Sequence, residues 1–150
     1  MEQQIQSTVK KFELEASVNL LNNKLHFLGK AGDNEPVHLD YTAPIGDNLG
    51  YMPLQIFLMS FAACAGGSVL YLLRRNGKTI NSFEVKATGI RRRAHPTSFS
   101  NILLDFYIKA DDLSPSDMEK AITDSESTYC PIWDMVKNNV LVETKFTFFD

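Results

Sequence analysis

The sequence predicts an α+β fold, in which a mostly antiparallel sheet packs on one long central apolar helix. Three patterns indicate it: alternating polar and apolar runs at both ends of the chain, a continuous apolar stretch at residues 56–73, and a helix-start signal at Ser114. The expected order is three strands, a helix, two strands, two helices and a last strand. The 150 residues match a common domain size, so we expect a single domain over residues 1–150.

Short strands are expected before the long helix. Phe12, Leu14, Ala16 and Val18 alternate with polar residues, which predicts a strand over residues 8–18. Asn22 and Asn23 favour a turn, because asparagine tolerates positive φ. The next two strands are expected at residues 24–28 and 36–41.

The apolar stretch at residues 56–73 is long enough to cross a bilayer. It also contains Ser60, Cys64 and Gly66, and half-buried strand patterns flank it on both sides. We therefore expect the buried helix of a soluble protein and no membrane association. Pro53 suits the first turn of this helix, and Gly77 suits its C-terminal cap.

The second half predicts a hairpin, two helices and a strand. Alternation at residues 83–89 and again at 102–108 predicts the hairpin. Ser114, Pro115 and Asp117 combine an N-cap, a proline at the first helical position and an acidic residue at the third. A short helix is expected to begin at Cys130-Pro131 and to end near Asn138-Asn139. The last strand is expected at residues 140–149.

Composition excludes several classes of function. The net charge of −3 and the pI near 5.6 give no general attraction to nucleic acid or to anionic membranes. Two cysteines are too few for a secreted disulfide scaffold, and residues 1–11 carry no signal-peptide pattern, so a cytoplasmic location is expected. No motif predicts a cofactor, and His26, His38 and His95 lack the spacing of metal ligands. The run Arg91-Arg92-Arg93 is interpreted as a solvated edge; contact with an anionic substrate, another subunit or RNA is the alternative.

The two cysteines are the candidate reactive groups. As the N-cap of a helix that begins at Pro131, Cys130 would lie beside free backbone N–H groups, which favours the thiolate and a lowered pKa. The alternative is a small hydrophobic residue at a helix start. Cys64 lies among alanine and glycine residues in the long helix. Those neighbours leave room for a substrate or another backbone, or they simply permit close helix packing.

Two segments resemble a known family. Residues 53–64, PLQIFLMSFAAC, resemble the central-helix motif of the OsmC/Ohr family of osmotically inducible and organic-hydroperoxide-resistance proteins. Residues 125–132, SESTYCPI, resemble that family's second cysteine motif. The resemblance covers roughly residues 24–149. It implies an OsmC-like fold in which two subunits intertwine as a homodimer, with both cysteines close together near the subunit interface.

The resemblance also implies an activity. Cys64 would be the peroxidatic thiol that attacks an organic hydroperoxide, and Cys130 the resolving thiol that forms a disulfide with it. A dithiol reductant would then restore both thiols. The candidates for an apolar surrounding that would favour organic hydroperoxides are Phe57, Phe61, Tyr71, Trp133 and Met135.

The chain departs from the family at the groups that activate the peroxidatic thiol. The efficient peroxidases have an N-terminal arginine, whereas no arginine precedes Arg74 here. They also have a glutamate just after the helix-opening proline, where this chain has Leu54-Gln55. The candidate supporting residues are Gln55, Glu126, Lys24 and Lys30. These departures place the chain nearer the OsmC-like branch, and they keep open a non-catalytic module that binds an apolar ligand at the dimer interface or senses redox state.

Overall fold

The structure is a computed structural model that describes residues 12–150. The chain divides into two compact units, Met1–Ile56 and Phe57–Asp150. Within residues 12–52 the first unit has three strands, and the second unit combines helices with three further strands. The predicted α+β class is confirmed, with the strands divided between two sheets.

The first unit is a three-stranded antiparallel sheet. Its strands are β1 (Ser17–Leu20), β2 (Phe27–Lys30) and β3 (Val37–Leu39), in the order β1-β2-β3. The first strand was predicted at residues 8–18; residues 8–11 lie outside the described part, and residues 12–16 are irregular. Ser17 pairs with Lys30, the last residue of β2, so β1 starts where its partner strand ends. The predicted turn at Asn22 is present, and its side-chain oxygen accepts hydrogen bonds from two backbone N–H groups.

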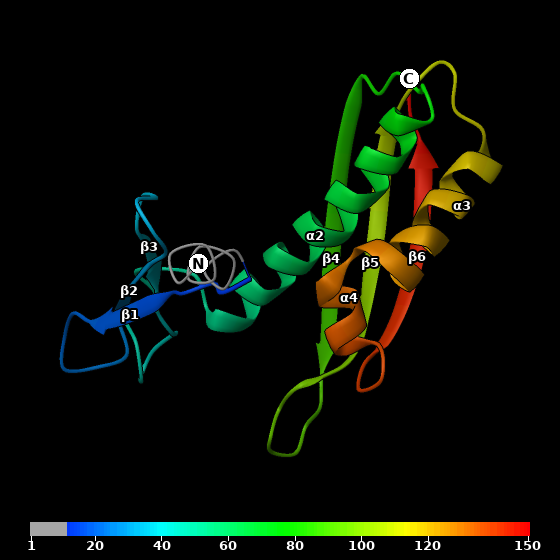
Figure 1. The fold of residues 1–150 in the computed structure, drawn as a ribbon. Coiled ribbons are helices and arrows are strands. Elements are labelled where there is room, and N and C mark those ends of the chain that lie inside the picture. The colour runs from blue at the N-terminus through cyan, green and yellow to red at the C-terminus, as the bar shows by residue number, and fades with distance from the viewer. Residues whose placement is uncertain (1–11) are drawn as a thin grey trace, which may run out of the picture. The chain divides into compact units, whose positions relative to one another are not determined.

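The second unit packs its helices on one face of a sheet (Figure 1). The sheet has the order β4-β5-β6, and its strands are β4 (Ser82–Arg91), β5 (Phe99–Lys109) and β6 (Leu141–Phe148). The predicted hairpin is confirmed, because β4 and β5 pair antiparallel. The last strand, β6, pairs with β5 in parallel, after a crossover through the later helices.

Alternation along β5 determines the core of the second unit. Ile102, Leu104, Phe106 and Ile108 are fully buried on the face that the helices cover. From the long helix, α2 (Pro53–Arg75), the residues Phe61, Ala65, Val69, Leu72 and Leu73 are buried. A Cβ atom at Gly66 would lie 2.7 Å from a methyl group of Val85, so this glycine permits the close approach of α2 to β4.

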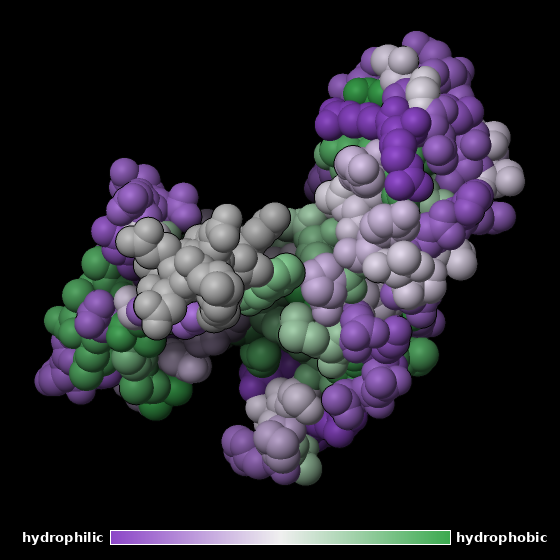
Figure 2. Space-filling view, in the orientation of Figure 1, coloured by the Kyte–Doolittle hydropathy of each residue, from purple (hydrophilic) through white to green (hydrophobic). Residues whose placement is uncertain are grey.

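Helix α2 starts and ends where the sequence predicts. Pro53 is its first residue, and Gly77, at φ +79°, follows its end. The N–H groups of Gly77 and Lys78 donate to the carbonyl groups of Arg74 and Leu73, which is the Schellman arrangement of hydrogen bonds. By length and composition α2 could span a membrane, and 39% of its most apolar window is buried. Figure 2 shows hydrophilic surface at its C-terminal end.

Three short helical segments connect β5 to β6. They are α3 (Pro115–Asp124), the π-helix η1 (Ser125–Tyr129) and α4 (Pro131–Val136). Ser114 and Asp117 form the capping box that starts α3, as predicted. The π-helix was not predicted from the sequence. It follows α3 without a break and leads directly to Cys130.

Candidate active site

The two cysteines meet within the second unit. Cys64 lies in the middle of α2, and Cys130 lies between η1 and α4. Their sulfur atoms are 2.9 Å apart, and both are free thiols, with the thiol of Cys130 donating to Cys64. A disulfide needs a sulfur-to-sulfur distance of about 2.05 Å, so a small local movement is enough to form the bond.

The π-helix brings Cys130 to this position. Ser125 is fully buried, and its hydroxyl donates to the carbonyl oxygen of Ala65, the residue that follows Cys64, at 3.3 Å. The backbone N–H of Cys130 donates to the carbonyl oxygen of Ser125 at 2.9 Å. The start of η1 is therefore attached to α2 beside Cys64, and its closing hydrogen bond fixes Cys130 nearby.

Cys130 is the N-cap of α4, as the sequence predicts, but the expected effect on its pKa is wrong. Its sulfur accepts a hydrogen bond from the N–H of Trp133 at 3.4 Å. Burial and the contact with Cys64 outweigh this bond and raise the pKa of Cys130 to about 12. Only 2% of the Cys130 side chain is exposed, so its thiolate would lack water. The thiol form is therefore the stable one at neutral pH.

Cys64 is the more accessible of the two sulfur sites. It is half-buried, whereas Cys130 is buried. Cys64 is therefore the cysteine that is partly open to solvent, and its sulfur contacts the buried thiol of Cys130.

Aromatic side chains form one wall beside the cysteines. Phe61 and Trp133 are buried and meet edge to face with ring centroids 5.7 Å apart. Phe57 contacts Phe61 and stacks on Phe99. Phe99 was not among the candidates from the sequence. Of the five apolar candidates, Phe57, Phe61 and Trp133 join this cluster. Tyr71 and Met135 are 58% and 68% exposed.

Two of the four candidate supporting residues, Gln55 and Lys24, make local contacts in the described part of the chain. Within the first unit, the side-chain oxygen of Gln55 accepts from the N–H of Met52 at the start of α2, and Lys24 pairs with Asp47. Lys30 is the exposed last residue of β2. In the second unit, Glu126 is exposed on η1. Among residues 12–150, no hydrogen bond or ion pair of the cysteine pair involves Glu126.

An arginine that was not among the candidates contacts the segment from Ser125 to Cys130, which we call the cysteine arm. The Arg75 guanidinium donates to the hydroxyl of Tyr129, the residue before Cys130, at 3.3 Å. It lies 5.6 Å from the ring centroid of Tyr129 and 5.7 Å from that of Tyr71. The hydrogen bond to Tyr129 raises the pKa of Arg75. Sequence reasoning missed this group because Arg75 and Tyr129 are 54 positions apart.

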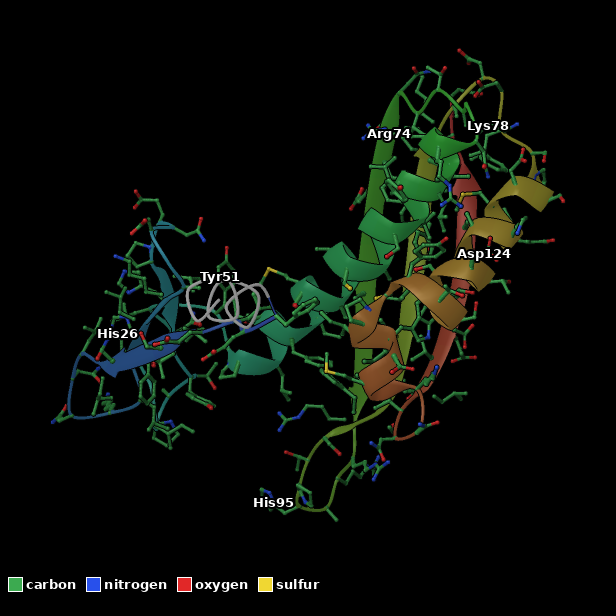
Figure 3. All side chains as sticks on the ribbon, viewed as in Figure 1. His26, Tyr51, Arg74, Lys78, His95 and Asp124 are labelled. Carbon is green, nitrogen blue, oxygen red and sulfur yellow. The ribbon has the colours of Figure 1, made fainter. Side chains whose placement is uncertain are left out.

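The histidines and the arginine run lie outside the cysteine pair. His26 and His38 share a hydrogen bond of 2.8 Å in the first unit, and His95 lies in the loop between β4 and β5 (Figure 3). Within residues 12–150, no three His, Cys, Asp or Glu side chains gather as a metal site. Arg91 donates to the carbonyl oxygen of Thr97, and Arg92 donates to that of Asn139. These contacts give both arginines a local structural role.

Sequence comparison agrees with the cysteine motifs. The model of the family described as OsmC-like protein matches residues 46–145. The chain belongs to the OsmC-like family. Protein YhfA of Escherichia coli K12 is 28% identical over 116 residues, which are 77% of this chain and 84% of YhfA.

Solved structures show the same fold. The OsmC-like protein from Mycoplasma pneumoniae superposes with a TM-score of 0.78 at 18% identity, over 92% of this chain and 98% of that protein. An organic hydroperoxide resistance protein OsmC from Legionella pneumophila gives a TM-score of 0.71 at 15% identity, over 91% and 97% of the two chains. The predicted family and its OsmC-like fold are both confirmed.

Proposed function

We propose that this OsmC-like protein is a thiol peroxidase that reduces organic hydroperoxides with Cys64 and Cys130. The observation that carries the proposal is the distance of 2.9 Å between the sulfur atoms of the half-buried Cys64 and the buried Cys130. The name of the Legionella protein, which refers to organic hydroperoxide resistance, supports the substrate class.

The cycle begins at Cys64. Its thiolate attacks the terminal oxygen of the hydroperoxide, the O–O bond breaks, and the alkoxide leaves as the alcohol after taking up a proton. Cys64 becomes a sulfenic acid. Exposure supports this role for Cys64 over Cys130, because a hydroperoxide can approach only an accessible sulfur.

Cys130 completes the cycle. Its sulfur attacks the sulfenic sulfur of Cys64, a disulfide forms, and the hydroxyl group leaves as water with the proton of the Cys130 thiol. A dithiol reductant then reduces the disulfide to two thiols by thiol–disulfide exchange and is itself oxidised to a disulfide. The sum is one hydroperoxide and two thiols converted to an alcohol, water and a disulfide. A cytoplasmic location belongs to the proposal, because reduced thiols persist there between cycles.

Turnover with a hydroperoxide tests the proposal. Reduced protein is mixed with cumene hydroperoxide and dithiothreitol, and hydroperoxide loss is followed. We expect turnover that Cys64→Ser abolishes, because no sulfenic acid can form at that position. Cys130→Ser is the matched variant: it keeps the first oxidation and loses the disulfide. Equal peroxide loss in the native protein and Cys64→Ser would contradict the proposal.

An apolar groove on α2 favours the second candidate, a module that binds an apolar ligand. The groove has a volume of about 350 Å³. Its lining includes Met59, Ala63, Gly67 and Leu70 of α2 and Phe83 and Val85 of β4. Binding of a fatty acid without any hydroperoxide turnover would favour this candidate over the enzyme.

The same surface supports a homodimer. The groove leaves one side of α2 uncovered, and the first unit separately exposes Val18 and Leu20 by more than half. A second copy of the chain would remove these apolar surfaces from water. Among the described residues, nothing lies within 4 Å of a Cβ atom built at Gly67, so Gly67→Arg is compatible with the single chain.

The mass of the protein in solution tests the homodimer. We expect light scattering to give a dimer for the native protein and a monomer for Gly67→Arg, with helix content preserved. Thr123→Arg, at an exposed helical position of α3 outside the groove, is the control. A native monomer, or a Gly67→Arg dimer, would contradict this part of the proposal.

A further inference from the structure

Three side chains join the end of the cysteine arm to α2. We call Arg75, Tyr71 and Tyr129 the Arg75 clamp. The guanidinium carbon lies 5.7 Å from the ring centroid of Tyr71 and 5.6 Å from that of Tyr129, and the guanidinium donates to the Tyr129 hydroxyl at 3.3 Å. Tyr71 belongs to α2 and Tyr129 ends η1, so the clamp bridges two elements.

The clamp lies on the same face of α2 as Cys64. The eleven residues from Cys64 to Arg75 make three turns plus about 20° of rotation, over about 16 Å along the axis. Long helical side chains point back toward the N-terminus, so Arg75 extends toward the cysteines. Tyr129 reaches it from the residue next to Cys130.

Both ends of the π-helix are therefore attached to α2. Ser125 holds its first residue through the carbonyl of Ala65, and Arg75 holds its last residue through Tyr129. Cys130 follows immediately, with its sulfur 2.9 Å from that of Cys64. Loss of the second attachment would leave η1 held at one end, and Cys130 would then sample positions farther from Cys64.

We propose that Arg75 is a positioning residue for the disulfide step: through Tyr129 it holds η1 on α2 and keeps Cys130 within reach of Cys64. The inference rests on the proposed function for its role in a peroxidase cycle. Restricting the arm raises the effective concentration of one sulfur at the other, which favours the disulfide.

The chemistry of arginine suits this role. Its flat guanidinium stacks on a ring and donates hydrogen bonds at its edge at the same time, which the ammonium of lysine does not. Within residues 12–150, no carboxylate pairs with Arg75, so the rings are its partners there. Arg74 precedes it on the exposed end of α2 (Figure 3) and carries the same charge, with no ring beside its guanidinium in the described chain.

A glutathione redox buffer measures the effect without any hydroperoxide. The two thiols lose two electrons to glutathione disulfide, which becomes two glutathione molecules, and the equilibrium constant reports the effective concentration. We expect Arg75→Ala to lower this constant roughly two- to fivefold, the size of an exposed cation–π contact. Arg74→Ala, the matched control, should leave it unchanged.

Two further variants separate positioning from general stability. Tyr129→Phe keeps the ring, so we expect it to lower the equilibrium constant for disulfide formation less than Tyr129→Leu does. Adding Tyr129→Leu to Arg75→Ala should cause no further loss, because both remove the same contact. The melting temperature of each variant is measured as well, so that a change in the equilibrium constant is not mistaken for an effect of unfolding.

Two outcomes would overturn the inference: equal constants for Arg75→Ala and Arg74→Ala, or additive losses in the double variant. Because the assay contains no hydroperoxide, its result is independent of peroxidase activity. A protein without turnover that still shows the Arg75 effect would refute the proposed function and leave the clamp intact.

Discussion

Helices α3 and α4 begin in the same way. Each starts with a proline, preceded by a side chain that accepts the N–H of the third helical residue. Ser114 accepts from Asp117 at 3.2 Å, and Cys130 accepts from Trp133 at 3.4 Å. Both helix starts therefore offer the same backbone N–H groups to a negative charge.

The surroundings of the two helix starts differ, and the pKa values of their acidic groups shift in opposite directions. At α3, the backbone N–H of Ser114 and the ammonium of Lys78 lower the pKa of the half-buried Asp117 to about 2. At α4, burial raises the pKa of Cys130 to about 12 although the N–H of Trp133 donates to its sulfur. Burial therefore decides the outcome: a helix start favours an anion only where water or a cation can also reach it.

The largest expected difference in stability is between the third residues of the two helices. Trp133 is fully buried against Phe61, whereas Asp117 at the matching position of α3 is only half-buried. We expect Trp133→Ala to lower the free energy of unfolding by about 3–5 kcal/mol, because it leaves a large cavity. Urea denaturation measures the change. Asp117→Ala should cost clearly less.

Trp133→Phe is the control for this prediction. It keeps an aromatic ring against Phe61 and removes the indole N–H, which is buried with no partner among the described residues. We expect this variant to lose much less stability than Trp133→Ala. A loss below about 1 kcal/mol for Trp133→Ala would show that the site behaves as a surface position.

The next effect is the pH dependence that the buried thiol causes. The pKa of Cys130 is raised in the folded protein, so above pH 9 the unfolded chain binds fewer protons than the folded one. Stability is then fully present below about pH 8 and falls as pH rises toward 12, by at most about 1.4 kcal/mol per pH unit. Cys130→Ser should remove this part of the slope.

Serine is the matched replacement, because it keeps a cap acceptor like that of Ser114 and does not titrate in this range. The hydrogen bond to Asp105 also raises the pKa of Tyr107, which contributes in the same pH window in both proteins. Only the difference between the two denaturation series is therefore informative. Identical slopes for both proteins would show that Cys130 is not buried as a thiol.

The elements marked by local chemistry were predictable from the sequence. Pro53 and Gly77 gave the ends of α2, and Ser114 with Asp117 gave the start of α3. The first strand was predicted too early, because alternation shows which residues share a face and does not show where the partner strand ends. The π-helix Ser125–Tyr129 depends on contacts with α2 that no local pattern encodes.

The site was predictable in part. The resemblance indicated that Cys64 and Cys130 lie close together, whereas spacing alone does not show it. The pKa of Cys130 was predicted in the wrong direction, because the N-cap pattern is local and burial is a property of the whole fold. Arg75 was missed for the same reason, since its partner Tyr129 lies on a different element.

The smallest expected effect on stability is at the start of α3, where Asp117 is half-buried. The pKa of Asp117 is lowered to about 2 from its ordinary value of 3.8, so between pH 4 and pH 2 the unfolded chain binds more protons than the folded one. This stability is present above pH 4 and is lost as the pH falls toward 2. Asp117→Asn should flatten the acid limb of a denaturation series, and Glu119→Gln, outside the capping box, should flatten it less. An unchanged acid limb in Asp117→Asn would mean that the capping hydrogen bonds do not favour the carboxylate, and the contrast with Cys130 would then rest on burial at α4 alone.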